Sequence, residues 1–382
     1  MPQQIAPVDR AVFSRYFSAT AVKRVTIGGV MIPQLFVPPA MFVGMLLTLW
    51  AWKCFWIIVM QDRLMYMSWM PPFSRSENMD DYEIECRPVQ WQESYFRSLD
   101  GTKLAICIGT IPQRVSSPSL LPSPSLEQRK RHVVICYFQG NGGSMPPRLP
   151  ILSTVLRALT SSTFSSSSSP PTDYTLVALS YRGYWKSSGR ASQIGLERDG
   201  QALLDWVTET YSAPDTDLKV VLWGHSLGSA VVSHTTATYL NRLTSSEGDG
   251  PDHPVSGIVL ETPSTSTKDI LKNLYPQRWL PYRYLWPFLW NNWSTAVAIT
   301  RIARWRDDAP EERREPPAIL LLIADQDEMI PSTAADELER LCRQNGLEAE
   351  RKSVAGALHT EALLKREGRE TLLAFIRRVT QK

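Results

Sequence analysis

A short segment at 224–228, with the sequence GHSLG, constrains the fold of this chain more than any other. It follows a β-branched apolar run at 219–223 that predicts a buried strand, and it precedes a run at 229–243, free of Pro and Gly, that predicts a helix. A serine on a tight turn between a strand and a helix has the geometry of a nucleophile elbow. Gly224 and Gly228 suit such a turn, because the strand and helix approach too closely for a Cβ atom. An ordinary structural turn is the alternative.

Strand-like and helix-like patterns alternate on both sides of this turn. Apolar runs typical of buried strands occur at 132–138, 174–180, 219–223, 257–260 and 318–324, and a last strand is expected at 348–354. Helices are expected at 145–160, 194–211, 229–243, 334–344 and 360–378. Two earlier strands, 91–97 and 101–108, meet at a turn signal and predict a hairpin. The order predicts an α/β fold whose mostly parallel sheet is covered by helices on both faces.

Residues 41–60 form an apolar run of about the length that a membrane-spanning helix requires. Its only charge is Lys53, whose long side chain can reach the membrane interface. We therefore expect a basic segment at 1–40, a transmembrane anchor at 41–60, a linker at 61–90 and a catalytic domain at 91–382. A hairpin or interfacial helix, or a buried helix packed on the domain, are the alternatives.

Residues 275–305 interrupt the alternation with a segment rich in Trp, Tyr and Pro. Such a segment suits a lid that offers an apolar surface to an acyl chain or touches the membrane. A packed satellite core is the alternative. Polar or Ser/Pro-rich insertions and a charged linker are expected at 115–126, 161–172, 244–254 and 306–317.

Composition excludes several classes of function. The net charge of +3 gives no support for a nucleic-acid partner. The five cysteines have no CxxC spacing, so neither a zinc site nor a disulfide framework is expected. We expect no metal and no cofactor.

A serine nucleophile needs a base, and the base needs a carboxylate to orient it. His359 is the only histidine downstream of the 318–324 strand, and it lies in a small-residue loop after the last strand. Asp325 and Asp327 both follow the 318–324 strand. The chain order Ser226, Asp, His359 is that of the α/β-hydrolases. On spacing alone, both aspartates remain candidates.

An oxyanion hole needs backbone N–H groups aimed at the developing negative charge. We expect one N–H from Leu227, at the start of the helix that follows the elbow, and a second from Asn141 in the glycine-rich loop after the 133–138 strand. Gly140 and Gly142 would let that backbone approach the substrate. A simple tight turn is the alternative for this loop.

With these motifs the chain resembles membrane-anchored serine hydrolases of the α/β-hydrolase superfamily. That group contains monoacylglycerol- and lysophospholipid-lipase-like enzymes and acyl-protein-thioesterase-like enzymes. The similarity covers roughly residues 60–380 and is carried by the segments 139–143, 181–189, 224–228, 260–266 and 327–331. The resemblance implies that Asp327, rather than Asp325, is the triad acid. The chain departs from the family at Gln139, where histidine is usual, and at Trp185, where glycine is usual and where the larger side chain is expected to narrow the site.

The resemblance implies hydrolysis of a carboxylic ester or thioester of a lipid through an acyl-enzyme intermediate. A serine aminopeptidase-like peptidase and a catalytically silent hydrolase fold used for interaction are the alternatives. The aromatic segment and the anchor favour a lipid over a peptide, and the intact Ser–Asp–His set argues against the silent fold.

Basic residues indicate the topology of the anchor. Four of them precede the apolar run, and two, Arg63 and Arg75, lie in the 20 residues that follow Met60. The positive-inside rule therefore favours a cytoplasmic N-terminus and a catalytic domain in the lumen of the endoplasmic reticulum.

Overall fold

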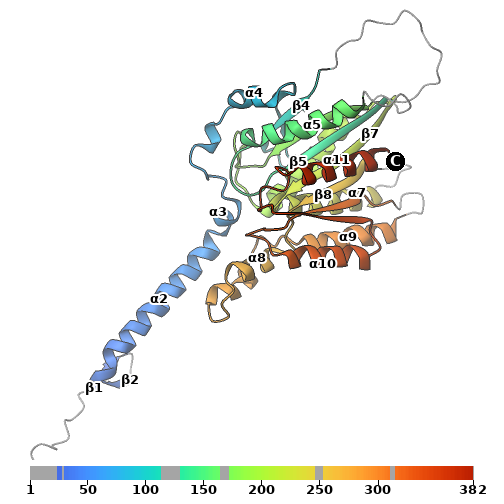
Figure 1. Ribbon diagram of the computed structural model, residues 1–382. Coiled ribbons are helices and arrows are strands. Elements are labelled where there is room, and N and C mark those ends of the chain that lie inside the picture. The colour runs from blue at the N-terminus through green and yellow to red at the C-terminus, as the bar shows by residue number, and fades with distance from the viewer. Residues whose placement is uncertain are drawn as a thin grey trace, which may run out of the picture. The chain divides into compact units, whose positions relative to one another are not determined.

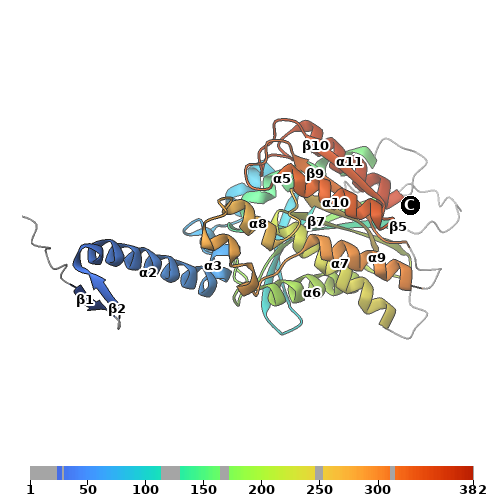
Figure 2. The same cartoon turned by 90° about the horizontal axis from the view of Figure 1, so that it is seen from below.

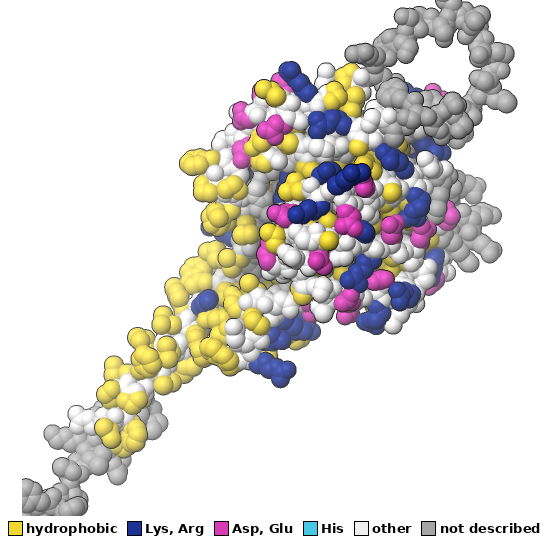
Figure 3. Space-filling model, in the orientation of Figure 1, with side chains coloured by type: hydrophobic (Ala, Val, Ile, Leu, Met, Phe, Trp, Pro, Cys, Tyr) yellow, Lys and Arg dark blue, Asp and Glu magenta, His cyan; other side chains and the backbone are white. Residues whose placement is uncertain are grey.

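The computed structural model describes residues 24–27, 30–112, 130–163, 172–245, 253–309 and 315–381, and the chain divides into two compact units, 1–57 and 58–382. In the first unit, β1 (Arg24–Ile27) and β2 (Val30–Pro33) pair antiparallel. A short turn of 3-10 helix, Gln34–Phe36, leads into α2 (Val37–Val59), which has no buried residue and carries hydrophobic side chains along its length (Figure 3). The stretch Gln34–Val59 is long and apolar enough to cross a membrane, and it fits a membrane anchor.

The second unit is built on an eight-stranded sheet with the order β10-β9-β8-β7-β5-β6-β4-β3 (Figure 1). Its first two strands, β3 (Gln90–Arg97) and β4 (Lys103–Thr110), form the expected antiparallel hairpin. Six strands follow that are parallel to one another: β5 (Lys130–Phe138), β6 (Thr172–Ser180), β7 (Thr216–His225), β8 (Val255–Glu261), β9 (Ala318–Ala324) and β10 (Ala349–Val354). The predicted α/β fold with a mostly parallel sheet is confirmed.

Helices cover both faces of this sheet (Figures 1 and 2). One face carries α5 (Leu149–Thr163) and α11 (Arg366–Gln381), and the other carries α6 (Gln193–Tyr211), α7 (Leu227–Ser245), α9 (Thr295–Asp308) and α10 (Ser332–Gln344). Alternate residues of β5 enter the two cores: Val134, Cys136 and Phe138 pack on the α7 side, and Val133, Ile135 and Tyr137 on the α5 side. Burial on both faces explains why the central strands are continuous apolar runs.

The aromatic segment 275–305 is divided between two environments. Its second half belongs to α9, whose Ile299, Ile302 and Trp305 are buried in the core. Its first half follows α8 (Thr267–Leu274) and contains two short 3-10 turns, Pro281–Tyr284 and Trp286–Phe288, with large exposed side chains. Only residues 275–294 therefore remain candidates for a lid.

Residues 61–90 are part of the second unit, which differs from the linker expected there. They form α3 (Gln61–Tyr66), 3-10 turns at Ser74–Ser76 and Asp80–Tyr82, and α4 (Glu83–Cys86). Tyr66 is 1% exposed, and its hydroxyl donates a hydrogen bond to Asn291 Oδ1 at 2.7 Å. A buried tyrosine bound to a residue more than 200 positions away fixes this segment to the domain.

The last helix also differs from expectation, because residues 360–364 form turns and α11 begins at Arg366 rather than at 360. The insertion expected at 115–126 lies outside the described residues. Those expected at 161–172, 244–254 and 306–317, and the basic segment at 1–40, lie outside them in part.

Candidate active site

Ser226 lies in the sharp turn between β7 and α7. Its φ is +53°, a left-handed conformation that costs a non-glycine residue on the order of 1–3 kcal/mol. Two hydrogen bonds hold the turn: Ser226 N–H donates to Glu261 O at 2.8 Å, and Ser229 Oγ donates to Gly224 O at 2.8 Å. The neighbouring strand β8 and the first turn of α7 thus hold the strained serine in place.

The two glycines of the turn leave no room for a side chain. A Cβ at Gly224 would lie 2.2 Å from Gly228 O, and a Cβ at Gly228 would lie 2.0 Å from Phe138 O. Both contacts are to backbone oxygens, which cannot move aside as a flexible side chain can. The turn therefore requires glycine at both positions.

Three side chains from separate strand ends meet at this turn. His359 Nε2 lies 2.9 Å from Ser226 Oγ, and His359 Nδ1 lies 2.8 Å from Asp327 Oδ2. Asp327 Oδ1 accepts two backbone N–H groups, from Met329 at 2.9 Å and Ile330 at 2.7 Å. Asp325, the other candidate acid, is exposed. The structure thus brings Asp327 to His359.

The environment of Asp327 keeps its carboxylate ionised. Burial raises its pKa, but the hydrogen bonds from His359 and from the N–H groups of Ile330 and Met329 outweigh burial, so the pKa falls below its usual range. An ionised Asp327 fixes the proton of His359 on Nδ1, and this leaves Nε2 free to accept a proton from Ser226 Oγ.

The loop at 139–143 lies beside the elbow, with Gly142 and Gly143 at φ of +70° and +72°. Residues 65–70 hold it: Gly142 N–H donates to Tyr66 O at 2.9 Å, Gly143 N–H donates to Met70 O at 2.6 Å, and the Asn141 amide donates to Met65 O at 3.3 Å. Leu227 begins α7, so its N–H is among those without a partner inside the helix. No sequence pattern indicates the contacts with 65–70, because they are made to backbone carbonyls.

The sequence profile of the alpha/beta hydrolase family matches residues 153–359, which is more than half of the chain. The chain belongs to the alpha/beta hydrolase family. Similar proteins include bem46 of Schizosaccharomyces pombe, which is 29% identical over 223 residues, 58% of this chain and 60% of that protein. WAV2 of Arabidopsis thaliana is 25% identical over 280 residues, 72% of this chain and 73% of that protein. The lysophosphatidylserine lipase ABHD12 of Danio rerio is 29% identical over 215 residues, 56% of this chain and 48% of that protein.

The chain thus spans between about half and three quarters of the length of these relatives. Among solved structures, a fungal esterase from Rhizomucor miehei has a TM-score of 0.52 at 15% identity, covering 82% of this chain and 94% of that one. An alpha-beta hydrolase from Vibrio vulnificus has a TM-score of 0.53 at 12% identity, covering 84% and 91%. These two likenesses concern the fold.

The chain departs from the family pattern given above at two buried positions. Gln139 is 2% exposed, and neither polar atom of its side chain has a hydrogen-bond partner within the described part of the chain. Trp185 is 1% exposed, and its indole N–H donates to Glu77 O at 2.8 Å. The indole thus packs among core residues, and the narrowing of the site by Trp185 stays a prediction.

A buried acid that no sequence pattern singles out lies next to the elbow. Glu261 ends β8 fully buried, and Trp223 Nε1 donates to its carboxylate at 2.9 Å. Burial raises the pKa of Glu261 to about 7, and burial also lowers the pKa of His225 to about 3. Both residues line a cavity of about 500 Å³ together with Trp223 and Arg148. A buried carboxyl supported by a single tryptophan leaves no signal in the sequence.

Proposed function

We propose that this chain is a membrane-anchored serine hydrolase that cleaves a carboxylic ester or thioester of a lipid through an acyl-enzyme on Ser226. One observation carries most of the proposal. Ser226 Oγ, both nitrogens of the His359 imidazole and Asp327 Oδ2 form one connected chain with separations of 2.9 and 2.8 Å. The elbow that presents Ser226 is strained and closely packed, as a nucleophile elbow requires.

In the proposed reaction, Ser226 Oγ attacks the carbonyl carbon while His359 Nε2 takes its proton. The charge that develops on the carbonyl oxygen would be met by the backbone N–H groups of Leu227 and Asn141. His359 then gives its proton to the leaving alcohol or thiol, and the acyl group stays on Ser226. A water molecule, deprotonated by His359, releases the acid. Asp327 stays ionised throughout and stabilises the imidazolium.

Two observations favour an acyl substrate. Relatives of several vertebrates carry the name lysophosphatidylserine lipase. Exposed apolar side chains also flank Ser226, His359 and Asp327, which we call the relay. Met329, two residues after Asp327, is 55% exposed, and Leu358, next to His359, is 42% exposed. Water-exposed apolar side chains beside a polar relay suit an acyl chain better than a peptide.

The segment 41–60 is proposed as the anchor, with the catalytic domain in the lumen of the endoplasmic reticulum. The Lys/Arg bias supports this orientation. An acceptor sequon appended after Lys382 is expected to be glycosylated, which a glycosidase-sensitive mass shift would report. An unmodified tail that is open to protease from the cytosolic side would place the domain in the cytoplasm.

A panel of lipid esters and thioesters tests the chemistry. Ser226→Ala is expected to lower turnover on the order of 10⁶-fold, with an unchanged melting temperature. Ser188→Ala, on an exposed loop serine, is the matched control and should keep wild-type turnover. Turnover retained by a folded Ser226→Ala protein would overturn the assignment.

A further inference from the structure

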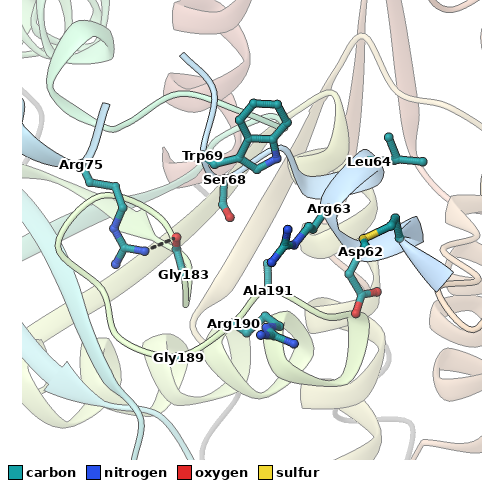
Figure 4. A pocket seen from close by; sticks show the side chains of 11 residues that line it. Asp62, Arg63, Leu64, Ser68, Trp69, Arg75, Gly183, Gly189, Arg190 and Ala191 are labelled. Atoms are coloured by element: carbon teal, nitrogen blue, oxygen red, sulfur yellow. Dashed lines mark hydrogen bonds between the residues drawn. The ribbon is translucent and has the colours of Figure 1, made fainter. Parts of the chain in front are cut away.

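A second cavity lies away from the relay. It has a volume of about 620 Å³ and is lined by α3 and the segment that follows it, by Arg75, and by the loop around Gly189 and Arg190 (Figure 4). Neither Ser226 nor His359 is among its lining residues. Its lining therefore differs from the residues proposed to carry out the chemistry.

The charges on its wall are mostly positive. Three arginines line it, Arg63, Arg75 and Arg190. Arg75 donates to the carbonyls of Gly183, Trp185 and Ser187 at 3.0–3.1 Å, which fixes one cation in the wall. Within the described part of the chain, the guanidinium groups of Arg63 and Arg190 form no hydrogen bond and no ion pair.

The one acid of the wall does not balance these cations. Asp62 accepts hydrogen bonds from the Trp290 indole at 2.9 Å and from the Asn291 amide. Its carboxylate is thereby held by the aromatic segment. Three guanidinium groups against one carboxylate give the wall a net positive charge, which favours an anionic ligand, and guanidinium is well suited to phosphate.

The remaining wall is apolar, and its place in the chain is informative. Met60, Leu64 and Trp69 also line the cavity, and Met60 directly follows Val59, the last residue of α2. The last residue of α2 is thus bonded directly to a residue that lines this cavity. Trp69 is 57% exposed. Exposed tryptophans with neighbouring arginines are typical of the interface between membrane and water.

Hydrogen bonds to α3 hold further exposed aromatic side chains next to it. Gln61 Nε2 donates to Phe288 O at 3.2 Å, and Gln61 Oε1 accepts the Trp290 N–H at 2.9 Å. Phe288 and Trp290 are 60% and 55% exposed. Residues 286–290 are therefore fixed beside the point where the chain leaves the apolar helix.

We propose that this cavity binds the head group of an anionic phospholipid of the membrane that holds the anchor. Arg63 and Arg190 would hold the phosphate, while Leu64 and Trp69 would contact the glycerol and the start of the acyl chains. The apolar wall favours a lipid over a free phosphate. This proposal rests on the membrane anchor and not on the chemistry at Ser226.

Lipid binding to the full chain in neutral detergent tests the proposal. Native mass spectrometry would compare dioleoylphosphatidylglycerol, dioleoylphosphatidylcholine and glycerol 1-phosphate. The wild type is expected to bind phosphatidylglycerol about tenfold more tightly than phosphatidylcholine, since arginines at a membrane surface attract anionic lipids. Arg63→Gln/Arg190→Gln should abolish this preference, and Arg63→Lys/Arg190→Lys should keep most of it. Arg340→Gln/Arg343→Gln, on exposed arginines of α10, is the matched control and should bind like the wild type.

Each other outcome contradicts the proposal. An unchanged preference in a folded Arg63→Gln/Arg190→Gln protein, or equal binding of both lipids by the wild type, would exclude a head-group site here. Equal binding of glycerol 1-phosphate would indicate a soluble phosphate ligand. Because binding is measured without turnover, a negative result here leaves the test of Ser226 unaffected.

Discussion

The elbow and the loop at 139–143 lie side by side at the proposed site, but they are built differently. The elbow is held from within the sheet: β8 supplies the acceptor for Ser226 N–H, and both of its glycines are packed against backbone. The loop is held mostly by carbonyls of residues 65–70, which lie outside the sheet, and by the Tyr181 hydroxyl, which donates to Gln139 O at 2.9 Å. A Cβ at Gly143 would meet no atom within 4 Å.

The conformations of the elbow and of the loop are therefore determined in two different ways. The elbow is specified by its own sequence, because only glycine fits at Gly224 and Gly228. The loop depends on a segment that directly follows the proposed anchor. The position of the nucleophile should therefore tolerate little change, whereas the loop should tolerate more.

The largest expected effect separates the two acids near the elbow. Asp327→Asn should lower kcat on the order of 10⁴-fold, because asparagine leaves His359 in the wrong tautomer. Asp325→Asn changes an exposed residue and should leave kcat close to wild type. Rates with a chromogenic ester would measure both, and the reverse ranking would refute the assignment of Asp327.

Alanine at the two kinds of glycine compares elbow and loop directly. Gly228→Ala should cost at least about 3 kcal/mol of unfolding free energy, because a Cβ 2.0 Å from Phe138 O forces the backbone apart. Gly143→Ala meets no neighbour and should cost about 1–2 kcal/mol for its left-handed conformation. Denaturation of the purified proteins gives both values, and equal costs would remove the distinction.

Glu261, the buried acid behind the elbow, makes the unfolding free energy of the protein depend on pH. The pKa of Glu261 is about 7 in the folded chain and 4.5 ordinarily, so the folded state keeps a proton that the unfolded state has released. Its contribution to unfolding free energy is present below pH 4.5 and is lost as the pH rises through 7, by an amount on the order of 3 kcal/mol. His225 acts in the opposite direction between about pH 3 and 6.5, because its pKa is lowered.

The comparison of wild type with Glu261→Gln isolates this effect, since His225 and Arg148 are present in both. The unfolding free energy of Glu261→Gln minus that of the wild type should be larger at pH 8 than at pH 5. Thermal unfolding at the two pH values measures the gain. Parallel pH profiles for the two proteins would mean that Glu261 does not carry the proton.

The smallest effect concerns the loop. Gln139→Met removes a buried amide without a described partner and keeps a similar volume, so it should stabilise the protein by about 1 kcal/mol. A melting curve would measure this. A loss of stability would show that the amide is paired in solution.

Patterns that come from burial could be predicted from the sequence. The strand Ala318–Ala324 matches its prediction to the residue, because every position is buried and Pro317 and Asp325 bound the run. The order of strands and helices follows from the same periodicities. The three relay residues could be selected because each follows a strand, and their catalytic roles remain a prediction.

Contacts made through backbone groups could not be predicted. Residues 61–90 are polar and rich in turn residues, and they join the domain through bonds such as those of Arg75 to carbonyls of the 183–187 loop. The start of α11 at Arg366 cannot be predicted either, because residues 361–364 continue its amphipathic pattern while forming turns. The burial of Glu261 cannot be predicted, since it depends on the packing of β8.

The central claim is that Ser226 is the nucleophile of a working relay. Labelling of the full chain with a fluorophosphonate probe, followed by peptide mapping, tests it most directly. We expect a single phosphonylated residue, Ser226, and no labelling of a Ser226→Ala protein that melts like the wild type. An adduct on a different serine, or labelling that persists in folded Ser226→Ala, would contradict it.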